Sequence, residues 1–375
     1  MDLDLSPAVT AFRDEVRAWL AVHVPGGLPS MDTAEGFAAH REWERTLADA
    51  RLAVVSWPVE YTGRDASLLE WVLFEEEYYA AGAPGRVSQN GIFLLAPTLF
   101  AHGTQEQRDR LLPRMARALD VWAQAWSEPE AGSDLAALRS RAVRTDGGWL
   151  LSGQKTWSSR AAFADRGFGL FRTNPDAHRH KGLTYFLFDL RAEGVTVRPI
   201  DQLDGEPGFA EIFLDEVFVP DRDVLGAVDD GWRVAMSTAS NERGLSLRSP
   251  GRFLAAADRL VDLWASHGDL SSRDRVVDAW IGAQAYRLHT FGTVTRLAEG
   301  GELGAESSVT KLFWSELDVA MHETALDLLG PDGELDGPWQ DGYLFSLAGP
   351  IYAGTNEIQR NVVAERLLGL PREPR

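Results

Sequence analysis

The apolar positions in the first third of the chain repeat with a helical period. Between Ser6 and about Leu119, hydrophobic side chains such as Phe12, Val16 and Leu20 recur at every third or fourth position, which is typical of helices with one buried face. Three helix starts also carry capping residues: Ser6 before Pro7, Ser67 with Glu70, and Thr104 with Gln107. Residues 1–119 are therefore predicted to form a helical domain.

The pattern changes after Asp120, where short runs rich in β-branched and aromatic residues alternate with turn residues. Turns such as Asp146-Gly147-Gly148 separate these runs. The six predicted strands cover Val121–Trp126, Trp149–Ser152, Phe168–Arg172, Leu183–Phe188, Val195–Ile200 and Glu211–Val219. Strands at such regular spacing indicate a compact antiparallel barrel or sandwich over residues 120–226.

The helical period returns at Gly231 and continues to Leu368, and Gly369 is placed where a glycine commonly ends a helix. Residues 227–375 are therefore predicted to form a second helical domain. A length of 375 residues is too great for one hydrophobic core, so several packed domains are expected. The order of helices, strands and helices predicts an α+β chain with three domains.

Composition excludes several classes of function. The formal net charge of −19 argues against nucleic acid or an anionic membrane as a partner. The sequence holds no cysteine, so disulfides, thiolate metal ligands and cysteine nucleophiles are excluded, and no metal site is expected. No apolar stretch approaches about 18 residues, and Asp2 and Asp4 stand where a signal peptide carries positive charge. A cytoplasmic location is the expectation.

Two segments of the central domain combine polar side chains with free backbone amides. The first, 126–134, leaves a strand through a proline–glycine turn. It could hold a phosphate or the polar edge of a ring, although a plain strand exit is the simpler interpretation. The second, 152–159, places the indole of Trp157 before two hydroxyls. Such an indole usually packs in a core, but it could also line a planar cofactor.

Two further segments lie in the C-terminal domain. One face of the helix that begins at Gly231 carries small side chains and a single carboxylate: Ala235, Thr238, Ala239, Glu242 and Ser246. A close contact between two helices, with a Glu–Arg pair at its edge, would explain this face without any chemistry. In the last segment, 349–360, Asn356 and Gln359 are predicted to form a capping box.

Three strings in these segments, in this order, resemble motifs of the acyl-CoA dehydrogenase family: Ser127-Glu128-Pro129 with Ala131-Gly132-Ser133-Asp134, Gly153-Gln154-Lys155-Thr156-Trp157, and Gly354-Thr355-Asn356-Glu357-Ile358-Gln359-Arg360. The resemblance extends from about Phe12 to Pro371. It implies an N-terminal helical domain, a central antiparallel β-barrel and a C-terminal four-helix bundle. It also implies that FAD lies between barrel and bundle, in a tetramer or dimer.

The resemblance implies roles for individual residues. The cofactor-binding positions are Gln124, Ala125, Trp126, Ser127, Gly132, Ser133, Trp157, Ser158, Ser159, Thr355 and Glu357. The substrate-contacting positions are Ser133, Ser240, Arg243, Ala353 and Gly354. Within the first set, Ser127 is expected near the polar edge of the flavin ring, and Trp157 is expected to pack on the flavin.

One glutamate is implied as the catalytic base. Many family members carry it directly before the Gly-Thr pair of the last motif, where this sequence has Ala353. A subset that resembles the isovaleryl and long-chain enzymes supplies it from the first helix of the bundle, and here Glu242 precedes Arg243 at that point. The implied reaction is α,β-dehydrogenation of an acyl thioester. Glu242 would remove the α-proton, and the flavin would accept the β-hydride.

Three departures from the family pattern concern the cofactor. Glu130 stands where glycine is more common. The stretch Asp327–Pro331 replaces a Gln-x-x-Gly-Gly element that completes the FAD site of a neighbouring subunit, and Arg273 is only a weak candidate for the pyrophosphate-binding cation. Such departures resemble actinobacterial-type dehydrogenases that act on steroid side chains or in specialised metabolism, some of which are two-subunit assemblies.

Several alternatives stay open. The leading hypothesis is a dehydrogenase that passes electrons to an electron-transfer flavoprotein. The others are an acyl-CoA oxidase-like flavoprotein that uses oxygen, and a partner subunit that supports the FAD site of a paralogue. The carrier is equally open between CoA and acyl carrier protein, and the assembly is open between a homotetramer, a homodimer and a hetero-oligomer with a paralogue.

Overall fold

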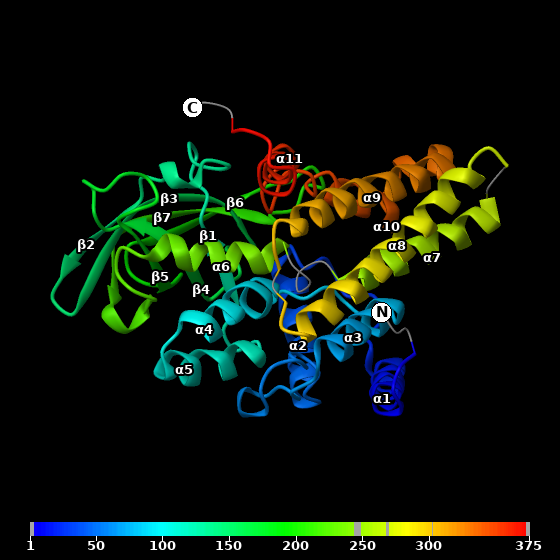
Figure 1. The fold of residues 1–375 in the computed structure, drawn as a ribbon, viewed down its shortest axis with the longest axis horizontal. Coiled ribbons are helices and arrows are strands. Elements are labelled where there is room, and N and C mark those ends of the chain that lie inside the picture. The colour runs from blue at the N-terminus through cyan, green and yellow to red at the C-terminus, as the bar shows by residue number, and fades with distance from the viewer. Residues whose placement is uncertain (1–3, 244–248, 268–269, 302, 373–375) are drawn as a thin grey trace. The chain divides into compact units, whose positions relative to one another are not determined.

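The computed structural model describes residues 4–243, 249–267, 270–301 and 303–372, without the side chains of residues 240–243. The chain divides into two compact units that alternate along the sequence, which the colours of Figure 1 help to follow. The helical unit comprises the chain up to Val24, Ala66–Ala83, and the chain from Arg243 onward. The sheet unit comprises Pro25–Asp65 and Pro84–Glu242.

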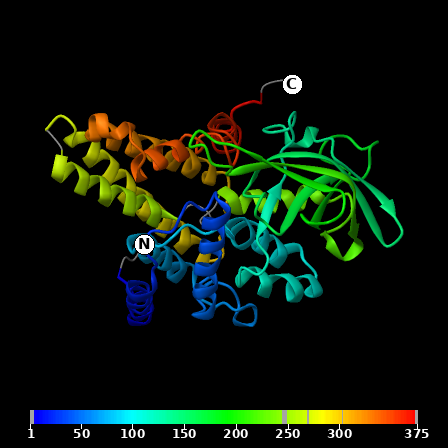
Figure 2. The same cartoon turned by 180° about the vertical axis from the view of Figure 1, so that it is seen from behind.

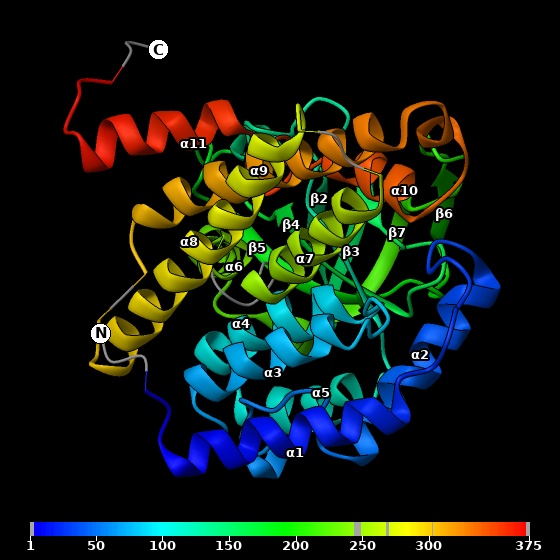
Figure 3. The same cartoon turned by 90° about the vertical axis from the view of Figure 1, so that its right-hand side faces the viewer.

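In the helical unit, α7, α8 and α9 pack against one another, α3 packs on α7, and α10 and α11 pack on α9. Figure 2 and Figure 3 show α7, α8 and α9 side by side. Phe253, Tyr286 and Trp314 are buried at the centre of this unit's core. The helices are α1 (Pro7–His23), α3 (Leu68–Ala80), α7 (Pro250–His267), α8 (Arg273–Ala298), α9 (Glu306–Leu329), the short helix η5 (Gly330–Glu334), α10 (Pro338–Ser346), α11 (Asn356–Val362) and the π-helical turn η6 (Val363–Leu367).

The sheet unit is built on eight strands in the order β6-β7-β3-β2-β4-β5-β8, with β1 paired to β4. Most neighbours are antiparallel, but β1 runs parallel to β4, and β2 meets β4 in parallel at a single residue pair. The strands are β1 (Trp122–Ala125), β2 (Arg141–Thr145), β3 (Gly148–Ser159), β4 (Arg166–Arg172), β5 (Leu183–Asp189), β6 (Val195–Ile200), β7 (Phe209–Pro220) and β8 (Val224–Leu225).

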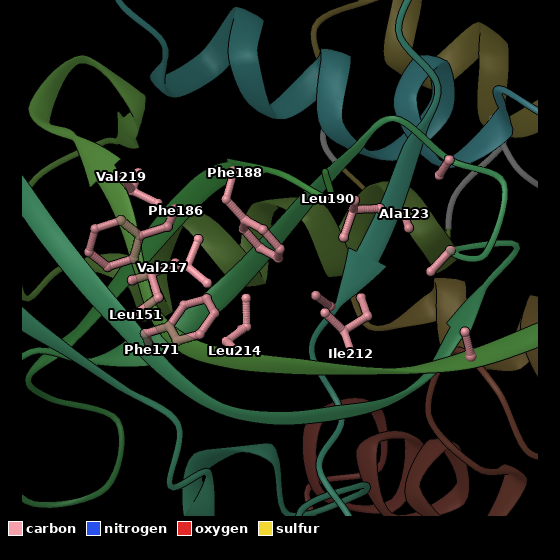
Figure 4. Close-up of a cluster of buried hydrophobic side chains, with 14 of the residues drawn as sticks. Ala123, Leu151, Phe171, Phe186, Phe188, Leu190, Ile212, Leu214, Val217 and Val219 are labelled. Carbon is pink, nitrogen blue, oxygen red and sulfur yellow. The ribbon is translucent and has the colours of Figure 1, made fainter. Parts of the chain in front are cut away.

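Helices and one dense apolar core complete the sheet unit. The helices are α2 (Ala34–Asp49), η1 (Val59–Tyr61), η2 (Asn90–Leu95), α4 (Ala96–His102), α5 (Gln105–Ala116), η3 (Leu135–Ala137), η4 (Asp221–Asp223) and α6 (Gly231–Arg243). Figure 4 shows the core, in which side chains from β3, β4, β5 and β7, among them Leu151, Phe171, Phe186 and Ile212, point toward one another. This core fixes the strands whose ends carry the candidate site.

The predicted elements agree with the structure in most of their positions. The capping residues Ser6, Ser67 with Glu70, and Thr104 with Gln107 all cap helices as predicted. All six predicted strands are present, but β2 and β8 were missed. In β2 only Ala142 is buried, and β8 has two residues, so neither shows the alternation that identifies a strand. Gly369 has a φ of 67°, as expected of a glycine that follows a helix.

Candidate functional site

The loop that leaves β1 is held in place by a buried ion pair. The ammonium group of Lys155 lies 2.9 Å from Oε1 of Glu128 and also donates to the carbonyl of Leu170 at 2.8 Å. The carboxylate of Glu128 accepts from the backbone N–H groups of Arg139 at 2.6 Å and Ser140 at 2.9 Å. Both ends of the loop are thereby tied to a single side chain, so the intervening backbone has a fixed conformation.

Burial works against the charge of both partners in this pair. For Glu128 the cost of burial is outweighed by the charge of Lys155 and by the hydrogen bonds from Arg139, Lys155 and Ser140, so its pKa lies below its ordinary value. Burial lowers the pKa of Lys155, against the opposing pull of the carboxylate. Because each charge has a partner and further hydrogen bonds, the pair is satisfied inside the unit.

A bulge in β3 turns Trp157 out of the core. The pairing of β3 with β7 shifts register between Lys155 and Ser158, so that Thr156 and Trp157 together face a single residue of β7. Trp157 has a φ of 58°, which is unusual for a bulky side chain, and its indole is 61% exposed. The interpretation of this indole as ordinary core packing is therefore wrong. Residues held in such sparsely populated conformations cluster at functional sites.

Two polar atoms next to the bulge are buried without a hydrogen-bond partner in the described part of the chain. They are Oγ of Ser158 and Nε1 of Trp126. The two segments are joined directly, because the N–H of Thr156 donates to the carbonyl of Ser127 at 2.9 Å. Buried donors of this kind are normally paired, so they indicate a place where a polar ligand atom can complete the hydrogen bonding.

Helix α6 is fixed to the sheet by a cluster of hydroxyl groups. Oγ1 of Thr238 lies 2.8 Å from Oγ1 of Thr98 and 3.3 Å from the hydroxyl of Tyr185. Tyr185 also makes an edge-to-face contact with the indole of Trp126, at 6.4 Å between ring centroids. Ala235 and Ala239 are buried beside Thr238, as the predicted small face requires. The helix and the loop after β1 are thus linked through one tyrosine.

The last turn before α11 has an unusual backbone. Ala353 and Gly354 both have positive φ, 57° and 77°, and the side chain of Gln359 donates to their two carbonyls at 2.8 and 3.2 Å. Thr355 is the N-cap and accepts from the N–H of Ile358 at 3.3 Å. The glutamine thus braces a turn that an alanine adopts only at some cost.

The predicted capping box at Asn356 and Gln359 is wrong. Asn356 is the first residue inside α11, where its buried side chain accepts from Nζ of Lys311 at 2.7 Å and from Oγ of Ser315 at 3.1 Å. The true cap, Thr355, is one residue earlier. Asparagine and threonine are both favoured at N-caps, so residue type alone does not tell the two positions apart.

The predicted site residues fall into two groups, each described within its own unit. The sheet unit holds Gln124, Ala125, Trp126, Ser127, Gly132, Ser133, Trp157, Ser158 and Ser159, and the helical unit holds Ala353, Gly354, Thr355 and Glu357. Gly132 and Ser133 are exposed on the loop after β1, and Ser159 ends β3. By their backbone Ser240, Glu242 and Arg243 belong to the end of α6, and their side chains lie outside the described residues.

Sequence reasoning missed the residues that support the site. The motifs contain Glu128, Lys155 and Gln359, but the sequence assigned these residues no role in supporting the site. In the structure, the side chain of each one holds a segment of the candidate site in place through hydrogen bonds. One signal was available for the lysine, because Lys155, Lys181 and Lys311 are the only lysines among 37 basic residues. Two of the three, Lys155 and Lys311, are fully buried.

The departures from the family pattern also have positions in the structure. Glu130 is exposed and forms an ion pair with Arg139 at 3.0 Å. Asp327 pairs with Arg275 at 2.6 Å, close to the end of α9. Among the described residues, no helix is long and apolar enough to cross a membrane, and no group of three or more acidic or histidine side chains is placed to hold a metal ion.

Comparison with known families decides the identity of the fold. Three models match in order: the N-terminal domain of acyl-CoA dehydrogenases over residues 6–118, the middle domain over 123–217 and the C-terminal domain over 229–368. The chain belongs to the acyl-CoA dehydrogenase family. This confirms the predicted fold, with its helical N-terminal part, central sheet domain and helical C-terminal part, and it makes the protein an FAD-dependent acyl-CoA dehydrogenase.

Relatives and solved structures agree with this assignment. The acyl-CoA dehydrogenase IpdE1 of Mycobacterium tuberculosis is 40% identical over 97% of this chain and 98% of the relative. FadE34 of the same organism is 42% identical over 87% of this chain, which spans 46% of that larger protein. Among solved structures, the Tcur3481-Tcur3483 steroid ACAD covers both chains completely, with a TM-score of 0.86 and 27% identity. The ChsE4-ChsE5 complex of M. tuberculosis gives 0.84 and 27%, also over both chains completely.

The described residues fit a flavin. A flavin is a planar ring with a polar edge, and the sheet unit offers an exposed indole beside the buried, unpartnered Oγ of Ser158 and Nε1 of Trp126. The indole of Trp157 can cover one face of a ring, and a hydroxyl and an indole N–H can meet its nitrogen or oxygen atoms. Both elements lie in the sheet unit of this acyl-CoA dehydrogenase.

Proposed function

We propose that this acyl-CoA dehydrogenase removes hydrogen from the α and β carbons of an acyl-CoA thioester, with Glu242 as the base. The observation that supports this most directly is the exposed, strained Trp157 at the bulge of β3. A residue in a sparsely populated conformation persists only where the surrounding structure enforces it, and such residues cluster at functional sites. Trp126, Ser127 and Ser158 would hold the cofactor beside it, together with Gln124 and Ser159.

The choice of Glu242 is supported by what stands at the alternative position. Ala353 occupies the place where many members of the family carry their base, and an alanine has no group that accepts a proton. From the sequence spacing, Glu242 is expected on the same side of its helix as Thr238, which lies four residues earlier. The hydroxyl cluster at Thr238 ties this side to β5 and α4. A fixed helix is what a base needs in order to be positioned within reach of an α-proton.

The remaining residues have supporting tasks in this proposal. FAD, when bound, accepts the hydride that leaves the β-carbon. The backbone N–H of Ala353 would donate to the thioester oxygen and stabilise the negative charge that develops there, as an oxyanion hole does. Gln359 fixes the orientation of this turn through the carbonyls of residues 353 and 354. Ser133, Ser240, Arg243 and Gly354 would contact the acyl-CoA, and Thr355 and Glu357 the cofactor.

The solved relatives support a bulky acyl group and a two-chain assembly. The Tcur3481-Tcur3483 protein is described as a steroid ACAD. Its name joins two protein names, and so does that of the ChsE4-ChsE5 complex. We therefore propose that this chain assembles with a paralogous subunit and acts on a steroid-derived acyl-CoA. Helix α8 supports an assembly because it exposes apolar side chains along one side, namely Val277, Trp280, Ile281 and Leu288.

Electron-transfer flavoprotein is the proposed acceptor, and the test of function separates it from oxygen. The chain is purified alone and with a co-expressed paralogue, and its absorbance is recorded during anaerobic titration with steroid-derived, branched and straight-chain acyl-CoAs. Bleaching of the flavin by at least one acyl-CoA is expected, followed by slow reoxidation in air and fast reoxidation by an electron-transfer flavoprotein. Rapid formation of hydrogen peroxide would instead indicate an oxidase. A flavin that no acyl-CoA bleaches would contradict the proposal.

A further inference from the structure

A hollow in the surface of the sheet unit is lined by arginines. Its volume is about 340 Å³, and its walls come from α2, the end of α5, the start of β4 and the end of β5. The basic residues in the lining are Arg41, Arg45, Arg114, Arg166 and Arg191. None of them is among the residues assigned to the flavin or the acyl-CoA. The hollow is therefore separate from the proposed catalytic machinery.

The hollow carries an excess of positive charge. Its lining has five guanidinium groups and three carboxylates, from Asp120, Asp165 and Asp189, which leaves two positive charges in excess. The whole chain, by contrast, has a formal net charge of −19. On so acidic a protein, a concave and locally positive surface concentrates anions where the rest of the molecule repels them.

The carboxylates of the hollow accept hydrogen bonds from only some of the N–H groups that its arginines can donate. Asp120 accepts from Nε and Nη2 of Arg114 at 2.7 and 2.8 Å, and Asp165 accepts from the N–H of Val121 at 2.9 Å and from Arg191 at 2.6 Å. Arg41 joins Asp165 at 2.9 Å and also donates to the carbonyl of Leu119. These bonds hold the guanidinium groups of Arg41, Arg114 and Arg191 against the carboxylates in the wall of the hollow.

Two of the arginines keep unused donors. The ion pair of Arg45 is a neighbouring contact on the same helix, in which Nη1 donates to Glu42 at 3.0 Å, and no hydrogen bond from its Nη2 is found among the described residues. Arg166 approaches Asp120 only at 3.4 Å, and its guanidinium lies 5.6 Å from the ring of Trp122. A guanidinium with spare N–H groups is well suited to a doubly charged oxyanion.

We propose that this hollow binds a phosphate group, either inorganic phosphate or the monoester of a small phosphorylated molecule. A phosphate monoester carries nearly two negative charges at neutral pH, which matches the excess charge of the lining. Its several oxygens can accept from Arg45, Arg166 and Arg191 together. The concave form and a volume near the lower end of ligand pockets favour a small anion over the flat, acidic surface of a partner protein.

The test is calorimetric titration of the FAD-loaded protein at constant ionic strength. Sodium phosphate, glycerol 1-phosphate, glycerol and sodium chloride are the four titrants. Saturable binding of one or both phosphates is expected, with none for glycerol or chloride. Binding of both identifies the monoester group as the ligand, and binding of inorganic phosphate alone identifies the free ion. The double variant Arg45→Gln/Arg191→Gln should weaken binding by about tenfold or more, since hydrogen bonds between charged groups are lost.

A matched control is available in the same unit. Arg144 is exposed, pairs with Asp221 and is not part of the hollow, so Arg144→Gln removes a positive charge elsewhere and should leave phosphate binding unchanged. The proposal is overturned if neither phosphate gives saturable binding, or if the double variant binds as tightly as the parent. It is equally overturned if Arg144→Gln weakens binding as much, because the loss then reflects the overall charge and not the arginines of the hollow.

Discussion

Nζ of Lys155 lies 2.9 Å from Oε1 of Glu128, and both side chains are buried beneath the loop that leaves β1. The chain uses arginine almost everywhere else for positive charge, since only three of its 37 basic residues are lysines. A compact ammonium group makes three bonds in a small volume, here to Glu128 and to the carbonyls of Leu170 and Trp126. The larger, planar guanidinium group of an arginine would need more room.

Breaking this pair should destabilise the protein. Lys155→Met leaves the carboxylate of Glu128 buried without its counter-charge, so the free energy of unfolding is expected to fall by about 3–5 kcal/mol. Chemical denaturation measures this loss. Lys181→Met is the matched control, because Lys181 is exposed, and it should change the stability by less than about 0.5 kcal/mol. Equal stability of both variants would show that the pair does not hold the loop.

Glu242→Gln should keep the flavin and lose the chemistry. An amide cannot accept the α-proton, so the rate of flavin reduction by acyl-CoA is expected to fall on the order of 10²–10⁴-fold, while the absorbance of the bound flavin stays unchanged. Stopped-flow anaerobic reduction provides the measurement. Glu193→Gln, an exposed glutamate in the sheet unit, serves as the control and should reduce at the parental rate. Normal bleaching in Glu242→Gln would remove the assignment of the base.

Trp157→Ala should weaken the binding of FAD without weakening the fold. The indole is 61% exposed and contacts the ring of Phe209 edge to face, with 5.9 Å between the ring centroids. The substitution therefore removes little packing, but it removes a surface on which a ring can stack. We expect the dissociation constant of FAD to rise about tenfold, and Trp157→Phe to restore most of the affinity. Fluorescence titration of the apoprotein with FAD measures both. Unchanged affinity in Trp157→Ala would place the flavin elsewhere.

Stability should decrease in mild acid because of His322. Burial, opposed only in part by Asp318, keeps the pKa of this histidine below its ordinary value of 6.5, so the folded protein favours the neutral ring. An unfolded chain then binds more protons, and the stability present above about pH 6.5 is lost as the pH falls toward the folded pKa. His322→Asn should flatten the curve of unfolding free energy between about pH 7 and 5, whereas the exposed His178→Asn should not. An unaltered slope in His322→Asn would exclude this source.

Trp280→Glu should reduce assembly and leave the isolated fold intact. This tryptophan is 43% exposed on α8 beside the exposed Ile281, and a charge at the centre of an apolar interface is costly. The affinity for a second subunit is expected to fall at least about tenfold, measured by sedimentation of the chain alone and with its paralogue. Asp278→Asn on the same helix, which removes a charge without adding one, is the control. Unchanged affinity between the subunits would show that the interface does not include α8.

The sequence predicted the elements well where one periodic pattern continued over many residues. The strand Val195–Ile200 was predicted with its observed bounds, because its turns and alternation are local features. The outward turn of Trp157 could not be read in the same way, since it depends on a register shift between β3 and β7. The glutamate–lysine pair is equally invisible in the sequence, because residues 128 and 155 meet only when the sheet forms.

The assignment of helices to partners was also beyond the sequence. An amphipathic pattern shows that α1 and α2 each have a buried face, and it does not show which element covers that face. In the structure α1 packs on α3 in the helical unit, while Phe37 of α2 belongs to the core of the sheet unit. The division of the chain at residues 119 and 226 stays a prediction. The family motifs carried most of the information on the site.

The alternation of the two units along the chain has a consequence for biosynthesis. The chain passes between the units at residues 24–25, 65–66, 83–84 and 242–243. On the ribosome, every segment of the sheet unit has been made once residue 242 emerges, whereas α3 must wait for its partner α7, which begins at Pro250. The apolar side chains of α3 that pack on α7 thus remain uncovered during most of translation, a state in which nascent chains need protection from aggregation.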